Sequence, residues 1–182
     1  MATGGAAVAA GAAFSSAVLF KAGDWVVHPL HGVGRVVKLE RKDFGSPPGQ
    51  LYYEIVISQG TLWVMAEAPP EGLRGLTAKA DLPRYRAVLQ SAPTLLNKDY
   101  HQRRTELRER LKDGTFQARC EVVRDLTAYG WEKRLSEPDA ALLRTCRDGL
   151  CREWAEVEAV TVAQATQEVE ELLRAAKQKY TK

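Results

Sequence analysis

The most constraining feature of this sequence is a change in its hydrophobic period at Pro69-Pro70. Before these prolines, β-branched and aromatic residues occur in short runs separated by glycine and proline, which is typical of strands. After them, apolar residues recur every three or four positions, which is typical of amphipathic helices. Because the period changes once and does not alternate, the sequence predicts an α+β fold with two domains and argues against a parallel α/β sheet.

Four runs in the first half are predicted to be strands, and turn residues separate them. They cover residues 23–29, 32–42, 51–58 and 61–66. The sequences SPPG at 46–49 and QG at 59–60 supply turns between the later runs. Four or five short antiparallel strands within about fifty residues predict a small, strongly curved barrel.

The second half predicts a compact bundle of about five helices. Asp113-Gly114 is expected to end one of them, because glycine accepts the left-handed conformation of a C-cap. Ser136-x-x-Asp139 and Thr161-x-x-Gln164 have the spacing of capping boxes for the last two helices. The predicted inner faces contain Phe116, Cys120, Val123 and Leu126; then Leu143, Cys146, Leu150, Trp154 and Val157; and finally Val162, Ala165, Val169, Leu172 and Ala176.

We expect three segments along the chain. Residues 1–17 are alanine-rich and uncharged but lack the basic start and leucine core of a signal peptide, so they predict a disordered tail. Residues 18–75 are expected to form the β domain, and residues 76–182 the helical domain. No eighteen-residue apolar stretch follows the tail, so no membrane contact is expected.

The residues that commonly carry chemistry argue against an enzyme or a metalloprotein. Cys120, Cys146 and Cys151 form no CxxC pair, and the three histidines lie elsewhere, so we expect buried thiols, no metal and no disulfides. The sequence also lacks the GxSxG, GxxxxGK[ST] and HExxH patterns. We therefore expect no catalytic residue and no cofactor.

The net charge of +3 conceals a local excess of positive charge. Residues 76–112 contain nine basic and four acidic residues, whereas residues 18–75 contain six of each. Within the basic segment, Arg104, Arg108 and Lys112 are four apart and share one face of a predicted helix. Such a row can neutralise successive phosphates of a nucleic acid, or it can be a solvated face balanced by nearby glutamates. The charge pattern alone leaves both interpretations open.

The stretch FKAGDWVVHPLHGVGRVVKLERK, residues 20–42, resembles the start of the CarD/CdnL family of bacterial transcription regulators. Its pattern F-x-x-G-D-x-V-V-x-P-x-H-G-V-G is specific, and the family shares this module with the transcription-repair coupling factor. The later phrases LYYEIVI, EAP followed by GLR, KDYHQRRTELRERLKDG and CEVVRDL agree with it, so the resemblance covers residues 20–176.

The resemblance implies two modules with different partners. A Tudor-like antiparallel β barrel binds the RNA polymerase β subunit. The helical module contacts promoter DNA, largely independently of sequence, in the minor groove at the upstream edge of the transcription bubble, and modulates open-complex stability. A bacterial, cytoplasmic protein that reaches the nucleoid through RNA polymerase is expected, and the absence of a coiled-coil pattern favours a monomer.

The resemblance assigns the DNA contact to the start of the basic segment. The implied residues are Tyr100, His101, Arg103, Arg104, Arg108 and Lys112. Tyr100 occupies the position at which family members typically carry a tryptophan that inserts at the bubble edge. An aromatic wedge stabilises unstacked DNA by filling the gap between bases, and tyrosine offers less area, so a weaker wedge is expected. The alternative is that Tyr100 packs on its own domain.

The polymerase-binding surface is expected at an exposed strand edge, where another chain can add a strand. The matching positions are Arg41, Lys42, Trp63 and Met65. Trp63 fits either an interface residue or the barrel core, whereas Trp25 is expected in the core. His28 and His31 are expected to be hydrogen-bonded turn residues.

Two other functions remain possible from the sequence. One is a protein adaptor that binds RNA polymerase without productive DNA contact. The other is a reader of modified peptides, which requires an aromatic cage built from residues such as Tyr52, Tyr53 and Trp63. Neighbouring strand residues point to opposite faces, so Tyr52 and Tyr53 cannot both line one cage, and this argues against the reader.

Overall fold

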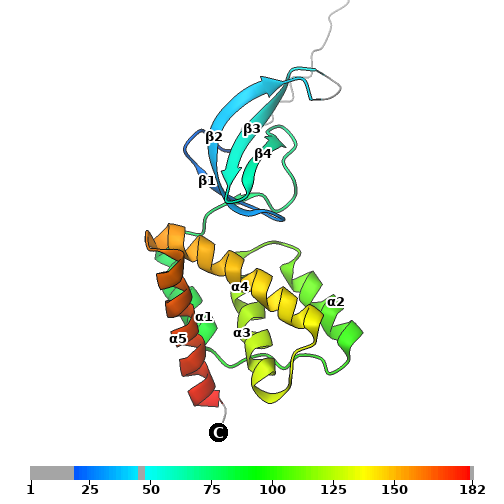
Figure 1. The fold of residues 1–182 in the computed structure, drawn as a ribbon, viewed down its shortest axis with the longest axis vertical. Helices are drawn as coiled ribbons and strands as arrows, with labels where there is room; N and C mark the ends of the chain where they lie inside the picture. The colour runs from blue at the N-terminus through cyan, green and yellow to red at the C-terminus, as the bar shows by residue number, and fades with distance from the viewer. Residues whose placement is uncertain (1–18, 45–47, 181–182) are drawn as a thin grey trace, which may run out of the picture.

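The computed structural model describes residues 19–44 and 48–180, and it consists of an antiparallel sheet followed by a group of helices (Figure 1). The strands are β1 (Trp25–His28), β2 (Gly32–Lys42), β3 (Gln50–Ile57), β4 (Gly60–Met65) and β5 (Arg74–Gly75). The helices are η1 (Lys79–Asp81), α1 (Leu82–Gln90), α2 (Tyr100–Leu111), α3 (Phe116–Glu132), α4 (Glu137–Glu158) and α5 (Val162–Tyr180). The predicted α+β fold is confirmed, and the predicted tail, residues 1–17, lies outside the described residues. Below, residues 25–75 are called the β module and residues 79–180 the helical module.

The sheet has the strand order β4-β3-β2-β1-β5, and every neighbouring pair is antiparallel. Tyr53 and Ile55 of β3 point into a core shared with Val26 and Val36, while Glu54, which lies between them in the strand, faces outward. Gly34 is required where β2 crosses β3, because a Cβ there would lie 2.6 Å from Ile55 Cγ2. This curled sheet with its own core is consistent with the Tudor-like module implied by the resemblance.

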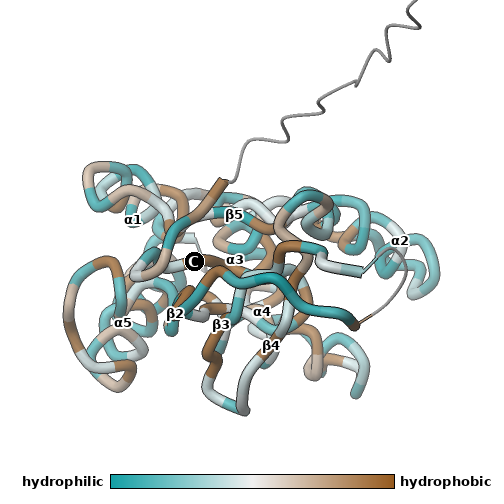
Figure 2. Tube along the Cα trace, turned by 90° about the horizontal axis from the view of Figure 1, so that it is seen from above, coloured by the Kyte–Doolittle hydropathy of each residue, from teal (hydrophilic) through white to brown (hydrophobic). Residues whose placement is uncertain are grey.

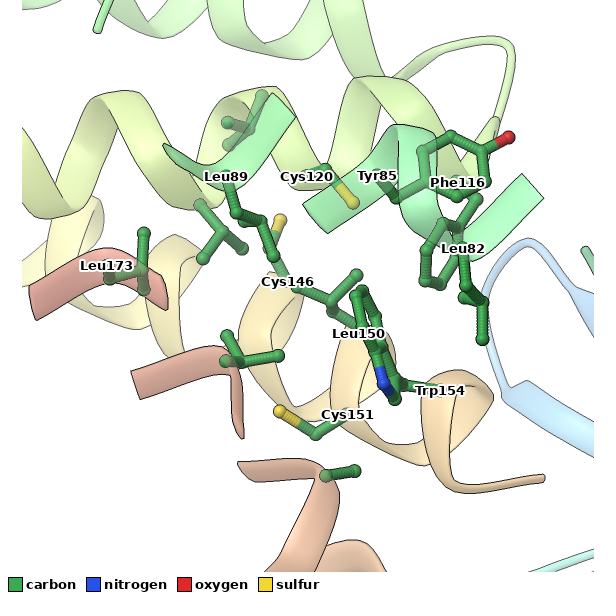
Figure 3. Close-up of a cluster of buried hydrophobic side chains, with 14 of the residues drawn as sticks. Leu82, Tyr85, Leu89, Phe116, Cys120, Cys146, Leu150, Cys151, Trp154 and Leu173 are labelled. Carbon is green, nitrogen blue, oxygen red and sulfur yellow. The ribbon is translucent and has the colours of Figure 1, made fainter. Parts of the chain in front are cut away.

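The helical module has a second, separate core formed by α1, α3, α4 and α5, with Leu107 of α2 also buried in it. Figure 3 shows side chains of these helices, among them Leu82, Phe116, Leu150 and Trp154, pointing toward one interior. The inner faces predicted for α3 and α4 are confirmed, with Leu143 and Val157 half-buried at the edge.

The inner face predicted for α5 is confirmed at Ala165, Val169 and Ala176 and differs at Val162 and Leu172. Ala165, Val169 and Leu173, spaced four residues apart, are buried, whereas Leu172 is only half-buried and Val162 is 43 % exposed. The reason is helical geometry: residue 172 is rotated by about 100° from residue 173, which continues the row already set by the two preceding buried positions.

The predicted helix ends are confirmed at three places. Gly114 has a φ of 61°, the left-handed conformation expected after α2. Thr161 and Gln164 form a reciprocal capping box, since each side chain accepts from the other residue's backbone N–H. Ser136 Oγ likewise accepts from Asp139 N–H, but the Asp139 carboxylate does not reach back to the Ser136 backbone. It binds a different helix, as described below.

All three cysteines are buried reduced thiols, as predicted. Burial raises the pKa of the Cys146 thiol to about 11, and it also raises the pKa of the Cys120 and Cys151 thiols. These side chains therefore behave as small apolar groups of the core. Among the described residues, no cluster of histidine, cysteine and carboxylate side chains suits a metal ion, and no helix has the length and hydropathy to cross a bilayer.

A bidentate ion pair joins the two modules. Arg74 on β5 donates from Nη1 and Nη2 to the carboxylate of Glu153 on α4, over 2.6 and 2.8 Å, and Glu153 has no exposed surface. Arg74 Nε also donates to the carbonyl of Gly114, and the Thr77 N–H donates to Glu153 Oε1. The buried Glu153 carboxylate thus binds the last strand and the chain leading to α1 directly. The turn before α3 is joined to it through Arg74.

We expect Arg74→Met to lower the free energy of unfolding by about 3 kcal/mol, because it leaves the buried Glu153 carboxylate without its main partner. Urea denaturation followed by circular dichroism measures this loss. Arg144→Met is the matched control, since Arg144 and its partner Glu137 are both exposed and should change little. Equal stability of the two variants would contradict a central role for the Arg74–Glu153 pair.

Candidate functional site

Helix α2 presents two different faces. Arg103 and Leu107 are buried against the helical module, whereas Arg104, Arg108 and Lys112 are exposed. Tyr100 begins the helix and is half-buried at the end of the exposed row, to which it belongs by its four-residue spacing. Figure 2 shows that α2 is hydrophilic along most of its length. The structure therefore collects an aromatic ring and three cations along one exposed line.

The exposed cations of α2 are not neutralised by neighbouring carboxylates. In the part of the chain that the structure describes, Arg104, Arg108 and Lys112 form no ion pair, and Arg104 donates instead to the Tyr100 hydroxyl over 3.0 Å. Glu106 accepts from Asn97 Nδ2 and contacts none of the three. Direct ion pairing with glutamates on the helix is not found there, and the exposed row is consistent with both interpretations, a phosphate-binding surface and a solvated face.

Arg103 does not belong to the exposed row. Its guanidinium is buried, donates from Nη2 and Nε to Asp139 Oδ2 over 2.8 and 3.2 Å, and donates from Nη1 to the Asn97 and Lys98 carbonyls. A buried cation with these partners is unavailable to a phosphate, so the expectation that Arg103 contacts DNA does not fit its position. We assign Arg103 to fixing the start of α2 against α4.

Tyr100 is held at the helix start by a small set of contacts. Asp99 is the N-cap and accepts from the Gln102 N–H over 2.9 Å, which sets where α2 begins. The Arg103 guanidinium carbon lies 5.8 Å from the Tyr100 ring centre, and the His101 ring lies edge-on at 5.2 Å. In Figure 1 this end of α2 lies far from the sheet. An aromatic ring with part of its surface free is thus displayed beside exposed His101 and Arg104.

The β module presents an aromatic cluster on the outer face of β3 and β4. Trp63 and Met65 of the edge strand β4 are half-buried, and Lys42 Nζ lies 4.6 Å from the Trp63 ring centre. Phe44, which was not predicted from the sequence, belongs to this cluster: it is 59 % exposed and lies edge-on to Trp63 at 5.6 Å. No periodicity marks Phe44, since it follows the last strand residue; only its solitary position in a polar turn could have drawn attention to it.

The remaining predictions for the β module have mixed outcomes. Arg41 is exposed, but its Nη1 donates to the Gly49 carbonyl over 2.7 Å and so stabilises the β2–β3 connection. The prediction that His28 is a turn residue is confirmed, because Nδ1 accepts from the Leu30 and His31 N–H groups. Burial, and then the charge of His31, lower the pKa of His28, which favours this neutral acceptor form.

The prediction that Trp25 lies in the barrel core is wrong. Trp25 is 37 % exposed and faces a cleft of about 610 Å³ between the β module and α4. Val26 fills the interior beside it, and the opposite strand residue, Arg35, lies over the Trp25 ring at 5.9 Å. The outward position follows because neighbouring strand residues point to opposite faces, and Val26 points inward.

The arrangement of the tyrosines argues against a peptide-binding cage. Tyr53 is fully buried, and its hydroxyl accepts from the Leu19 and Phe20 N–H groups. Tyr52 lies on the opposite face, edge-on to Phe44 at 5.3 Å. The two tyrosines therefore cannot line one cage, as the strand period predicted.

Comparison with known families agrees with this two-part architecture. The model of the CarD-like/TRCF RID domain matches residues 20–68, and that of the CarD C-terminal domain matches residues 85–170, together more than half of the chain. The chain belongs to the CarD family. Members are of a transcription-factor type and are not known as enzymes, and the family indicates transcription regulation through an interaction with RNA polymerase.

One curated relative extends over almost the same length. The Bacillus subtilis (strain 168) protein described as "Putative transcription factor YdeB" is 28% identical over 149 residues, which cover 80% of this chain and 97% of the relative. The similarity therefore includes both modules of the CarD-family architecture.

We expect Arg103→Met to destabilise the protein by about 3 kcal/mol, because it leaves the buried Asp139 carboxylate unpaired. Arg104→Met, one residue further on the exposed side, should leave the free energy of unfolding nearly unchanged. Chemical denaturation of both variants makes the comparison. If the Arg103→Met protein were as stable as the parent, the structural role of Arg103 would be wrong, and Arg103 would again be a candidate for DNA contact.

Proposed function

We propose that this CarD-family protein binds the RNA polymerase β subunit through its β module. We further propose that it contacts promoter DNA at the upstream edge of the transcription bubble through α2. By this bridge it modulates the stability of the open promoter complex. The single observation that carries the DNA contact is the exposed row of Tyr100, Arg104, Arg108 and Lys112, which lacks carboxylate partners in the described part of the chain.

The geometry of the row suits a duplex that ends in unpaired bases. Three cations spaced by one helical turn can each lie near a backbone phosphate, and such contacts carry affinity without reading sequence. Tyr100 at the end of the row supplies a flat face that can fill the gap at an unstacked base step. Specificity would then come from the shape and deformability of the bubble edge.

The β module supports a polymerase contact through strand addition. β4 is an edge strand that pairs only with β3 in the described residues, so its outer edge can accept a strand from a partner. Trp63, Met65 and Phe44 provide half-buried or exposed apolar area beside that edge, and Lys42 adds a charge. Aromatic residues of this kind commonly dominate the energy of protein interfaces.

Binding both partners explains why weak DNA affinity is sufficient. The net charge of the chain is only +3, so free DNA should bind weakly at physiological salt. Once the β module is bound to polymerase, the effective concentration of DNA at α2 is high, and a few contacts are enough. The alternative, an adaptor that binds polymerase without using DNA, makes the opposite prediction for α2 variants.

We expect Tyr100→Ala to shorten the lifetime of open promoter complexes by about tenfold, because one aromatic stacking contact is worth about 1–3 kcal/mol. Tyr100→Trp should lengthen it, since the larger ring covers more of the unstacked base. The measurement is the decay of heparin-resistant complexes formed with bacterial RNA polymerase. Leu30→Ala is the control, as Leu30 is 85 % exposed and lies in the β1–β2 turn. Unchanged lifetimes for both Tyr100 variants would favour the adaptor.

We expect Trp63→Ala to weaken binding to RNA polymerase by about 2 kcal/mol, or roughly thirtyfold in Kd, because it removes the central ring of the Phe44–Trp63 cluster. Fluorescence anisotropy with labelled protein measures the affinity. Trp25→Ala is the matched control, because Trp25 is an exposed tryptophan on β1, three strands away from β4 and beside α4. Equal affinity of the Trp63 variant and the parent would exclude β4 as the polymerase-binding edge.

A further inference from the structure

A second aromatic feature lies next to the proposed wedge. In Figure 1 the segment between α1 and α2, residues 91–99, runs past the end of α3. Side chains of this segment and of α3 line a cavity of about 160 Å³. Its apolar walls come from Leu95 and Leu96 of that segment and from Tyr129 and Trp131 of α3. Leu95 is 93 % exposed, so its side chain lies at the open rim of the cavity.

The guanidinium of Arg103 lies close both to Tyr129, which lines the cavity, and to Tyr100. The Arg103 Cζ atom lies 4.9 Å from the ring centre of Tyr129, in the cavity wall, and 5.8 Å from the ring centre of Tyr100. Lys98, which also lines the cavity, is two residues before Tyr100. DNA that meets Tyr100 therefore arrives beside the mouth of this cavity.

We propose that this cavity receives one unpaired nucleobase from the single-stranded part of the promoter DNA, next to the base step that Tyr100 contacts. This inference rests on the proposed function, because it needs DNA at α2. It adds a second contact between the protein and DNA, which is made to an unpaired base. Proteins that bind single strands combine aromatic stacking surfaces with cations that follow the backbone, and both are present here.

The cavity is large enough for one nucleobase but smaller than the usual pocket for a complete small-molecule ligand. Pockets for complete small-molecule ligands usually measure roughly 300–1,000 Å³, well above the 160 Å³ found here. A planar base fits such a space when it is swung out of the stack, while the sugar and phosphate remain outside. Tyr129 and Trp131 supply flat faces for stacking, which does not depend on the identity of the base.

The charge at the rim suits a phosphate backbone. Lys98 and Lys133 are exposed cavity residues with no ion pair in the described part of the chain, and they face one exposed carboxylate, Glu132. The other lining carboxylate, Asp125, is already neutralised by its hydrogen bonds to Arg124 and Arg110. The net local charge is therefore positive, as a phosphate requires.

The cavity is formed in advance of any ligand. Thr94 N–H donates to Asp125 Oδ1 over 2.9 Å, and Arg124 donates to the Ser91 and Thr94 hydroxyls. Arg124 and Asp125 are buried, so these bonds fix the connecting segment to α3 from within. A base entering the cavity therefore does not need to order its walls, and more of the stacking energy remains for binding.

The test uses open complexes formed by RNA polymerase, the full chain and fork-junction promoter DNA with 5-iodouracil at each unpaired position near the upstream edge. Irradiation should crosslink one of these positions to Tyr129 or Trp131. Trp131→Leu should reduce the crosslink at Tyr129, because it removes the other aromatic wall of the cavity. Lys98→Glu with Lys133→Glu should reduce crosslinking at both aromatic residues while preserving the fold, since both lysines are exposed. Trp25→Leu is the control and should crosslink like the parent.

A second measurement distinguishes the contribution of the cavity to open-complex lifetime from that of Tyr100. An abasic site at the crosslinked position should shorten the open-complex lifetime about tenfold with the parent protein, and much less with Trp131→Leu, because the contact is already lost. Crosslinks that map only to Tyr100, or none in the helical module, would overturn the cavity assignment. The proposed function is judged independently, by whether Tyr100→Ala shortens the lifetime on unmodified DNA.

Discussion

Glu153 lies in the middle of α4 without exposed surface, and its carboxylate receives the guanidinium of Arg74 and the backbone N–H of Thr77. A buried carboxylate is tolerated only with partners of this quality, so the folded protein requires the end of the sheet to meet α4 at one place. Arg74 also donates to the Gly114 carbonyl at the turn that follows α2. The turn between α2 and α3 is thus joined to the sheet through the same guanidinium that binds this carboxylate.

The proposed bridge between RNA polymerase and DNA requires two surfaces held at a defined separation. The β4 edge and the Tyr100 end of α2 lie in different modules with separate cores, and α2 itself contacts mainly α3. The Arg103–Asp139 pair holds the start of α2, the Arg110–Asp125 pair holds its last turn against α3, and Arg74 donates to the Gly114 carbonyl in the turn that follows. These polar contacts, together with the buried Leu107, set where the exposed row is displayed.

The sequence predicted much of the fold because its signals were local. Strand and helix positions, the Gly114 C-cap and the Thr161–Gln164 box all follow from residues within a few positions of one another. The inner faces of α3 and α4 followed from their period. The candidate DNA-facing row was visible for the same reason, because a four-residue spacing shares one face of any α-helix.

What the sequence by itself determined is therefore the order of elements, the faces of its helices and the family to which the chain belongs. Only the tertiary structure decided that Arg103 is buried while Arg104 is exposed, because the partner Asp139 lies 36 residues away on another helix. The same holds for Arg74 and Glu153, which are 79 residues apart, for the outward Trp25, and for the cavity between Leu95 and Trp131. Whether a charged or aromatic side chain is buried depends on its tertiary contacts with residues distant in sequence. The spacing of residues along the chain does not contain that information.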